Sequence, residues 1–189
     1  MRVLLGSKSP RRKELLSMLS IKFDMVSIDC VESYPKSMLS INIAQYLSEK
    51  KSLAYKSLCD SELLITADTI VLVDDVVLNK PTNRGEAFDM INLISGKTHQ
   101  VITGVTIRTK EKITSFSTFT DVSMDKIDNY EKNFYVDNYA ILDKAGGYGI
   151  QDWLGLSHVN AIKGCYYNVM GLPTNSVYKR LKNDFSYEL

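Results

Sequence analysis

The chain has 189 residues, of which 44% are hydrophobic and 24% charged, a composition typical of a globular protein with a real core. Its 23 basic and 22 acidic residues nearly cancel, which argues against a broad basic field for nucleic acid or for an anionic membrane surface. No signal segment opens the chain and no apolar run approaches the roughly 18 residues of a membrane span. We therefore expect a cytoplasmic protein with neither nucleic acid nor membrane as a partner.

Cysteine and histidine restrict the chemistry further. Cys30, Cys59 and Cys165 lie far apart and form no C-x-x-C pair, which argues against a disulfide framework or a structural zinc site and favours a reducing compartment. The two histidines, His99 and His158, make a Ser-His-Asp triad improbable. Any metal chemistry would then use oxygen ligands, which favours Mg²⁺ or Mn²⁺.

The chain opens with an apolar strand over residues 3–5, followed by a small-residue turn and a helix. Ser9 is a suitable cap and Pro10 a suitable first helical residue, so Arg11 and Arg12 fall among the free amide donors of the first turn. Each cation there costs about 0.3–1 kcal/mol unless an anion is bound. The turn therefore predicts a phosphate site, although it has neither Walker nor dinucleotide glycine spacing. The alternative is that both arginines extend into water.

Strand and helix patterns alternate up to residue 96. In chain order we predict a strand over 23–28, a polar loop over 31–40, a helix over 41–58, strands over 63–67 and 70–73, a turn at Asp74 and Asp75, a strand over 76–78, and a helix with the apolar stripe Ala87, Met90, Ile91 and Ile94 that ends at Ser95 and Gly96. The two helices are predicted from apolar residues at helical spacing, and the strand over 63–67 is predicted from a short apolar run.

The second half of the sequence also combines predicted strands and helices. We predict strands over 100–108 and 113–122 joined by a charged turn, a polar helix over 125–134, a glycine-rich segment over 143–151, a strand over 159–162, and a last helix that ends near Lys182. Repeats, low-complexity linkers and a clear domain boundary are absent from the sequence. The pattern indicates one α/β domain over residues 1–189.

Asp68 is the best single candidate for a catalytic carboxylate. It follows the apolar run over 63–67, so we expect it at the end of a buried strand and at the rim of the core. A carboxylate in such a place can hold a hard cation or accept a proton from water. The alternative is an aspartate that only terminates the strand.

Lysines near these segments suit phosphate. Lys80 precedes Pro81, and this rigid pair holds the ammonium in one place. Lys51 lies in the helix over 41–58 and can reach along its inner face, but Lys50 is adjacent and the sequence does not say which one points inward.

The only glycine cluster lies near Gln151. Gly146, Gly147 and Gly149 let the backbone approach a ligand closely, and the glutamine amide offers a donor and an acceptor that suit the edge of a base. A tight turn with an exposed glutamine is the alternative.

Seven collinear segments resemble the Maf family over nearly the whole chain. They are Ser7-Lys8-Ser9-Pro10-Arg11-Arg12, Ala67-Asp68-Thr69, Asn79-Lys80-Pro81, Leu93-Ile94-Ser95-Gly96-Lys97-Thr98-His99, Thr103-Gly104-Val105, Asp143-Lys144-Ala145-Gly146-Gly147-Tyr148-Gly149-Ile150-Gln151 and Asn168-Val169-Met170-Gly171-Leu172-Pro173. The resemblance implies a nucleoside triphosphate pyrophosphatase, which cuts between the α and β phosphates, and a link of some members to septum formation.

The resemblance also implies roles for particular residues. Asp68 matches the general base and metal-site carboxylate, and Glu32 matches a second acidic position of the metal site. The positions that match the phosphate-contacting set are Ser7, Arg12, Lys51 and Lys80. The positions that separate a dTTP/UTP-hydrolysing subgroup from one acting on 7-methyl-GTP are Arg11, Thr69 and Gln151, and this chain follows the first pattern.

Further expectations follow from the same likeness. They are an α/β fold of two lobes around an elongated mixed sheet, similar to inosine triphosphate pyrophosphatase, with a substrate cleft between the lobes, a divalent cation (Mg or Mn), and a homodimer. Asp152 departs from the family pattern. A carboxylate beside Gln151 would disfavour other anions and alter the base pocket, so the resemblance leaves the preferred nucleotide open.

Two alternatives stay open. One is a nucleotide-binding regulator of septum formation and cell division with incidental turnover, and the other is a 7-methyl-GTP pyrophosphatase. The sequence favours an enzyme, because a sensor does not need a carboxylate at Asp68 beside so many cations.

Overall fold

The computed structural model describes residues 1–188. The elements, in chain order, are β1 (Arg2–Gly6), α1 (Pro10–Met18), β2 (Phe23–Met25), α2 (Ser40–Ala54), β3 (Glu62–Val73), β4 (Val76–Leu78), α3 (Arg84–Ile94), β5 (Thr98–Arg108), β6 (Ile113–Met124), α4 (Asn129–Asn138), the 3-10 turn η1 (Ala145–Gly147), α5 (Trp153–His158), β7 (Val159–Lys163), α6 (Tyr166–Met170) and α7 (Thr174–Phe185). Within residues 1–188, no helix is long and apolar enough to span a membrane.

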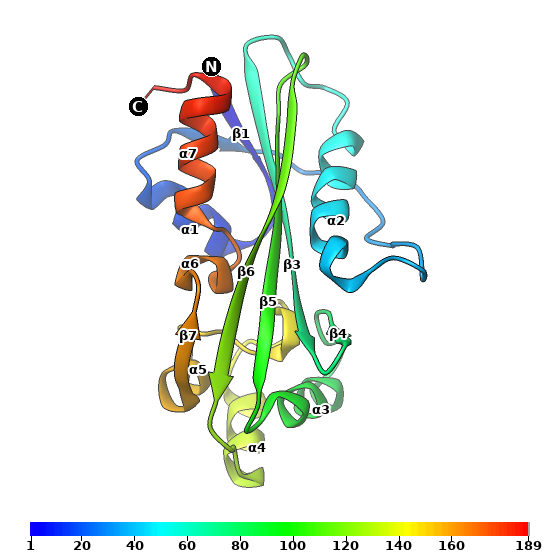
Figure 1. The fold of residues 1–189 in the computed structure, drawn as a ribbon, viewed down its shortest axis with the longest axis vertical. Helices are drawn as coiled ribbons and strands as arrows, with labels where there is room; N and C mark the ends of the chain where they lie inside the picture. Colours follow the sequence, from blue (N-terminus) through cyan, green and yellow to red (C-terminus); the bar gives the residue numbers. More distant parts are fainter. Residues whose placement is uncertain (189) are drawn as a thin grey trace. The chain divides into compact units, whose positions relative to one another are not determined.

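The strands form a mixed sheet in the order β2-β1-β3-β5-β6-β7, and β4 pairs with β3 off this path (Figure 1). β1 pairs in parallel with both β2 and β3, whereas β4 and β7 pair antiparallel with β3 and β6. The predicted α/β class with a mixed sheet is therefore confirmed.

The chain divides into two compact units. Unit 1 contains residues 1–69, 103–118 and the segment from Gly171 onward, and unit 2 contains residues 70–102 and 119–170. Three strands, β3, β5 and β6, contribute residues to both units.

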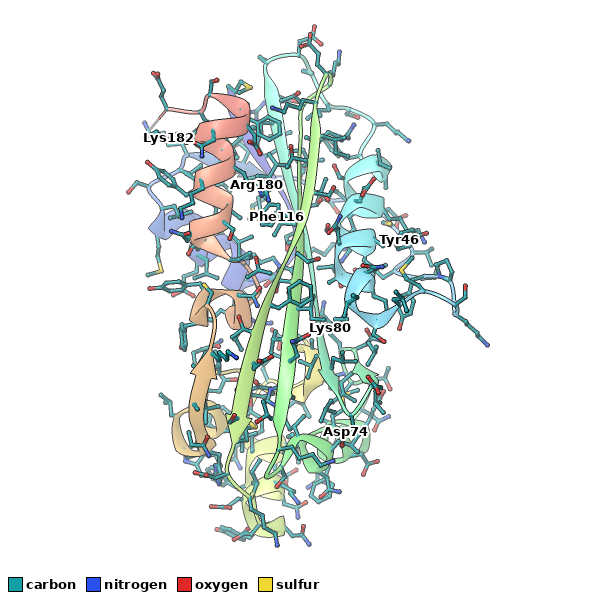
Figure 2. The ribbon with its side chains drawn as sticks, viewed as in Figure 1. Tyr46, Asp74, Lys80, Phe116, Arg180 and Lys182 are labelled. Atoms are coloured by element: carbon teal, nitrogen blue, oxygen red, sulfur yellow. The ribbon has the colours of Figure 1, made fainter. Side chains whose placement is uncertain are left out.

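In unit 1, helices α1 and α7 lie on one side of the strands and α2 lies on the other (Figure 1). Amphipathic spacing explains α7, which buries Val177, Leu181 and Phe185. The guanidinium of Arg180 on the same helix stacks 4.3 Å from the ring centre of Phe116 on β6 (Figure 2).

Helix α2 packs unusually close to β5. A Cβ atom added at Gly104 of β5 would overlap the backbone of Ala44 and Gln45 in α2, so only glycine fits there. The Ser48 hydroxyl of α2 lies 2.9 Å from the Thr106 hydroxyl of β5. This close approach determines where the rest of α2, including Lys51, meets the sheet.

Unit 2 has its own core, built from α3, α4, the segment before α5 and residues of β3, β4, β5 and β6. Helix α3 begins at the cap Asn83 and buries the predicted stripe Ala87, Met90, Ile91 and Ile94. Helix α4 begins with a capping box between Asp128 and Glu131, which explains why it starts at residue 129 and not at 125 as predicted.

Strand β3 differs most from the prediction. We predicted strands over 63–67 and 70–73 separated by Asp68 and Thr69, but one strand runs without a break from Glu62 to Val73. Asp68 is therefore in the middle of a strand and not at its end. The strand continues through this polar pair because both side chains have hydrogen-bond partners in the fold, which are described below.

Other boundaries shifted for local reasons. Helix α2 ends at Ala54 and not at 58, where Arg108 donates to the carbonyls of Ser52 and Tyr55 and so satisfies the last turn. Strand β2 ends at Met25, and the short helices α5 and α6 were not predicted. The turn at Asp74 and Asp75 is confirmed, since both have positive φ, 47° and 63°, as two-residue hairpin turns require.

Candidate active site

An ion-pair cluster occupies unit 1 where α2 faces β3. The ammonium of Lys51 lies 2.5 Å from Asp68 Oδ1 and 3.0 Å from Glu32 Oε1. The side chains of Lys51 and Asp68 are only 12% and 10% exposed, whereas that of Glu32 is 50% exposed. A nearly buried carboxylate needs a partner of opposite charge, and Lys51 provides it. The structure thus answers the question of the two adjacent lysines, because Lys50 instead donates to Ser33.

Consecutive residues of a strand point to opposite faces, and β3 uses both. Asp68 contacts Lys51 from α2, and Thr69 accepts a hydrogen bond from Arg12 of α1. One dipeptide therefore links the strand to helices on its two sides.

The guanidinium of Arg12 is directed at protein acceptors. Its Nε donates to the carbonyl of Gly171 at 2.8 Å, Nη1 to the carbonyl of Ala67 at 2.9 Å and to Ser7 Oγ at 3.4 Å, and Nη2 to Thr69 Oγ1 at 2.9 Å. Two of these acceptors directly flank position 68 in the chain. Arg12 therefore bonds to the backbone carbonyl before the carboxylate and to the side-chain hydroxyl after it.

The reason for this contact lies in the strand lengths. β1 ends at Gly6, which pairs with Thr66 of β3, so β1 does not continue alongside Ala67. Beyond the end of β1, the side chain of Arg12 donates a hydrogen bond to the carbonyl of Ala67. A buried carbonyl left without a donor would cost about 1–3 kcal/mol.

The charges of this cluster act on one another. The pKa of Arg12 lies below its ordinary value, chiefly because the side chain is buried. The carboxylate of Asp68 opposes this shift, the positive charge of Arg11 adds to it, and the carboxylate of Glu32 opposes it. Two arginines and two carboxylates are thus near enough to interact across unit 1. Because Arg12 stays protonated, the cluster keeps a permanent positive charge.

The predicted first turn of α1 is confirmed. Ser9 caps the helix by accepting from the backbone N–H of Arg12 at 3.4 Å, and Pro10 opens the helix. The hydroxyl of Ser7 accepts from the backbone N–H of Ser9 at 3.2 Å. Arg11 is half-buried beside Arg12.

Unit 2 contains the other two predicted site residues, Lys80 and Gln151 (Lys80 is labelled in Figure 2). The backbone N–H of Gly146 donates to the carbonyl of Asn79, which directly precedes Lys80, at 3.0 Å. Gly146 and Gly147 have φ values of 71° and 74°, which other residues rarely adopt. A backbone hydrogen bond therefore joins the glycine-rich segment that leads to Gln151 to the segment that carries Lys80. The side chain of Lys80 is exposed.

Gln151 has an unusual environment. Its Oε1 is buried and has no hydrogen-bond partner within residues 1–188. The preceding Ile150 is 4% exposed and belongs to the core of unit 2. A buried acceptor without a donor costs about 1–3 kcal/mol, so such an atom marks a place where a ligand donor would be welcome.

Oxygen ligands for a divalent cation are present in unit 1. Within residues 1–188, no group of three or more His, Cys, Asp and Glu side chains gathers as a metal site. Asp68 and Glu32 nevertheless converge on one cationic group, the ammonium of Lys51. Mg²⁺ commonly uses one or two carboxylates and takes further oxygens from substrate phosphates, so this pair of donors fits such an ion.

Seven predicted site residues thus lie in unit 1, namely Ser7, Arg11, Arg12, Glu32, Lys51, Asp68 and Thr69. Two further groups contact these residues and were not predicted: the hydroxyl of Thr103, 3.0 Å from that of Thr69, and the carbonyl of Gly171, which accepts from Arg12. Both residues belong to segments that carry the family resemblance, which was the available signal, but no side-chain chemistry distinguished them.

Comparison with known proteins identifies the family of the chain. A family model described as "Maf: Maf-like protein" matches residues 2–184. A dTTP/UTP pyrophosphatase of Parabacteroides distasonis is 50% identical over 184 residues, which are 96% of this chain and 95% of the relative. The dTTP/UTP pyrophosphatase of Bacteroides thetaiotaomicron is 46% identical, and the match covers 95% of this chain and 94% of the relative.

Among solved structures, the Ham1 protein of Staphylococcus aureus matches 66% of this chain and 72% of its own. The TM-score is 0.44 and the sequence identity 9%, a likeness too slight to support an argument about the site.

Proposed function

The chain belongs to the Maf family, and from this membership and its site we propose that it hydrolyses dTTP and UTP to the nucleoside monophosphate and pyrophosphate. The observation that carries the proposal is the nearly buried Asp68, held by Lys51 and flanked in the chain by the two Arg12 contacts. Relatives of similar length named dTTP/UTP pyrophosphatase support it.

In the proposed reaction, Asp68 accepts a proton from the water that attacks the α-phosphorus. A new P–O bond forms to the water oxygen, and the bond from the α-phosphorus to the bridging oxygen breaks with its electron pair leaving on pyrophosphate. Ser7, Arg12, Lys51 and Lys80 are the proposed phosphate-binding residues. Since Arg12 donates four hydrogen bonds to protein acceptors, we assign it chiefly an electrostatic role.

We propose Asp68 and Glu32 as the residues that would hold a divalent cation, Mg²⁺ or Mn²⁺. Such an ion would supply charge neutralisation of the phosphate oxygens when bound. Lys51 already holds a positive charge between the two carboxylates, which supports this assignment.

The proposed base preference follows from the amide of Gln151. Thymine and uracil both carry an N3–H donor, whereas cytosine has an acceptor at N3. A buried acceptor without a donor, Gln151 Oε1, suits the first two bases and rejects the third. Arg11 and Thr69 remain proposed specificity positions, and the hydroxyl of Thr69 already bonds to Arg12.

The test measures pyrophosphate release from dTTP and UTP by the wild type and by Asp68→Asn. Asparagine keeps the size of the side chain but accepts no proton, so kcat should fall by about 10²- to 10⁴-fold. Asp137→Asn, which changes an exposed carboxylate paired with Arg84, is the control and should keep full activity. Unchanged turnover in Asp68→Asn would refute the role of Asp68, and tight nucleotide binding without turnover by the wild type would favour the regulatory alternative.

The same assay with 7-methyl-GTP separates the two subgroups, and hydrolysis of that nucleotide well above dTTP and UTP would contradict the proposed preference. We also propose a homodimer, which light scattering coupled to size-exclusion chromatography would detect as twice the chain mass.

A further inference from the structure

Tyr135 of α4 holds both ends of the turn that carries Gln151. Its hydroxyl donates to Asp152 Oδ2 and accepts from the backbone N–H of Gly149, each at 3.0 Å. The tyrosine is fully buried. One hydroxyl group thus joins the residue two before the glutamine to the residue directly after it.

The carboxylate of Asp152 is committed to this turn. Its Oδ2 lies 3.4 Å from the ammonium of Lys144, and its backbone N–H donates to the carbonyl of Gly149 at 3.1 Å. A Cβ atom at Gly149 would lie only 2.6 Å from Asp152 Oδ2, so the glycine makes room for the carboxylate. From the sequence we expect the carboxylate of Asp152, beside Gln151, to alter the base pocket, and in the structure this carboxylate contacts Lys144 and Tyr135.

Tyr135 remains a phenol in the native protein. Burial raises its pKa, the Gly149 N–H lowers it, and Asp152 raises it, with a clear net increase. The hydroxyl therefore stays a proton donor to Asp152 throughout the neutral range, and the turn keeps one hydrogen-bond pattern.

We propose that Tyr135 and Asp152 are positioning residues for base selection, which act by holding Gln151 in place. Ile150 anchors the glutamine in the core on one side, and the Asp152–Tyr135 hydrogen bond anchors it on the other. An amide presents an oxygen at one end and an NH₂ at the other, so it separates N3–H from a bare N3 only when the glutamine keeps one orientation towards the base, and a fixed backbone removes one source of reorientation. This inference rests on the proposed function.

The experiment compares UTP and CTP, because these substrates share the sugar and the triphosphate and differ only at N3 and C4 of the base. Damage to the phosphate chemistry lowers kcat/KM for both and leaves their ratio unchanged. Tyr135→Phe and Asp152→Ala should each lower the ratio of kcat/KM for UTP over CTP by about tenfold, the value of one hydrogen bond. The loss should appear mainly as a higher KM for UTP.

Two variants serve as controls. Asp152→Asn keeps an oxygen that accepts from Tyr135 and should retain the wild-type ratio. Tyr139→Phe removes a hydroxyl from a residue whose ring stacks on that of Tyr135 at 4.9 Å, without changing the pair, and should also retain it. Melting temperatures of all variants separate unfolding from a change in selection.

Each outcome is decisive. A retained ratio in both Tyr135→Phe and Asp152→Ala, with stability or overall activity lowered, would show a purely structural role and overturn the inference alone. A wild type that cleaves UTP and CTP equally well would overturn it too, while leaving the pyrophosphatase activity in place. A wild type that cleaves neither UTP nor dTTP would overturn the proposed function together with this inference.

Discussion

The ammonium of Lys51 and the carboxylate of Asp68 meet at 2.5 Å, although the two residues come from a helix and from the middle of a strand. The same ammonium lies 3.0 Å from Glu32. A positive charge between two carboxylates stabilises both of them, and that arrangement has measurable consequences.

Replacing Lys51 by methionine should leave Asp68 nearly buried without its counter-charge. We expect the free energy of unfolding to fall by about 1–3 kcal/mol, and added Mg²⁺ to raise the melting temperature of the variant more than that of the wild type. Thermal melting with MgCl₂ or with a chelator checks this. Lys50→Met is the matched control, since Lys50 bonds to Ser33, and an equal response of both variants to Mg²⁺ would contradict the idea that a cation replaces the ammonium.

Replacing Arg12 by lysine should disconnect β3 from α1. A single ammonium cannot reach the carbonyls of Ala67 and Gly171 and the hydroxyl of Thr69, which the guanidinium reaches from three nitrogens. We expect about 2 kcal/mol or more of destabilisation in urea unfolding, and a larger effect on kcat than on KM. Lys13→Gln on the same helix is the control, and an Arg12→Lys protein as stable as the wild type would refute this role.

Gly104→Ala should push α2 away from β5, because the added methyl group overlaps the backbone at Ala44. Overpacking of this kind costs about 1–3 kcal/mol, and the shift of α2 should also lower kcat through Lys51. Gly85→Ala in α3 is the matched control, since its Cβ would meet only Asn83 Oδ1, at 3.3 Å. Urea unfolding and the pyrophosphate assay measure both effects, and equal behaviour of the two variants would contradict the prediction.

His99 makes stability depend on pH in the acid range. It is buried, with Nε2 2.6 Å from the hydroxyl of Tyr148, and burial lowers its pKa from 6.5 to about 4. The unfolded chain therefore binds a proton near pH 6.5 and the native protein only near pH 4, so this contribution to stability is complete above 6.5 and is lost as pH falls towards 4. The loss amounts to about 3 kcal/mol.

Urea unfolding at pH 7, 6 and 5 checks this for the wild type and for His99→Gln, which keeps a hydrogen-bonding group towards Tyr148. The variant should lose less stability between pH 7 and 5 than the wild type. Parallel curves for the two proteins would show that His99 does not cause the acid sensitivity.

The elements predicted from the sequence are those with local signals. Ser9 and Pro10 marked the start of α1, and the apolar stripe from Ala87 to Ile94 marked α3. The continuity of β3 had no local signal, because Asp68 is tolerated inside the strand only through Lys51, which lies 17 residues earlier.

The candidate site shows the same limit. Residue types and the family resemblance were enough to nominate Arg12 and Lys51, but not to find their partners. Arg12 bonds to the carbonyl of Gly171, 159 residues away, and a backbone carbonyl carries no mark in the sequence. Whether Lys50 or Lys51 turns inward depends on how α2 is rotated against β5, where Gly104 sets the contact.

The opposite orientation of Asp68 and Thr69 makes the spacing of β3 as important as its residues. Substitutions among the buried apolar residues ahead of Ala67 alter the packing but leave Asp68 and Thr69 on their own faces of the sheet. An inserted or deleted residue there, with the pairing to β1 retained, would turn the carboxylate towards α1 and the hydroxyl towards α2, and would undo both contacts at once. We therefore expect β3 to tolerate exchanges of residues better than a change in their number.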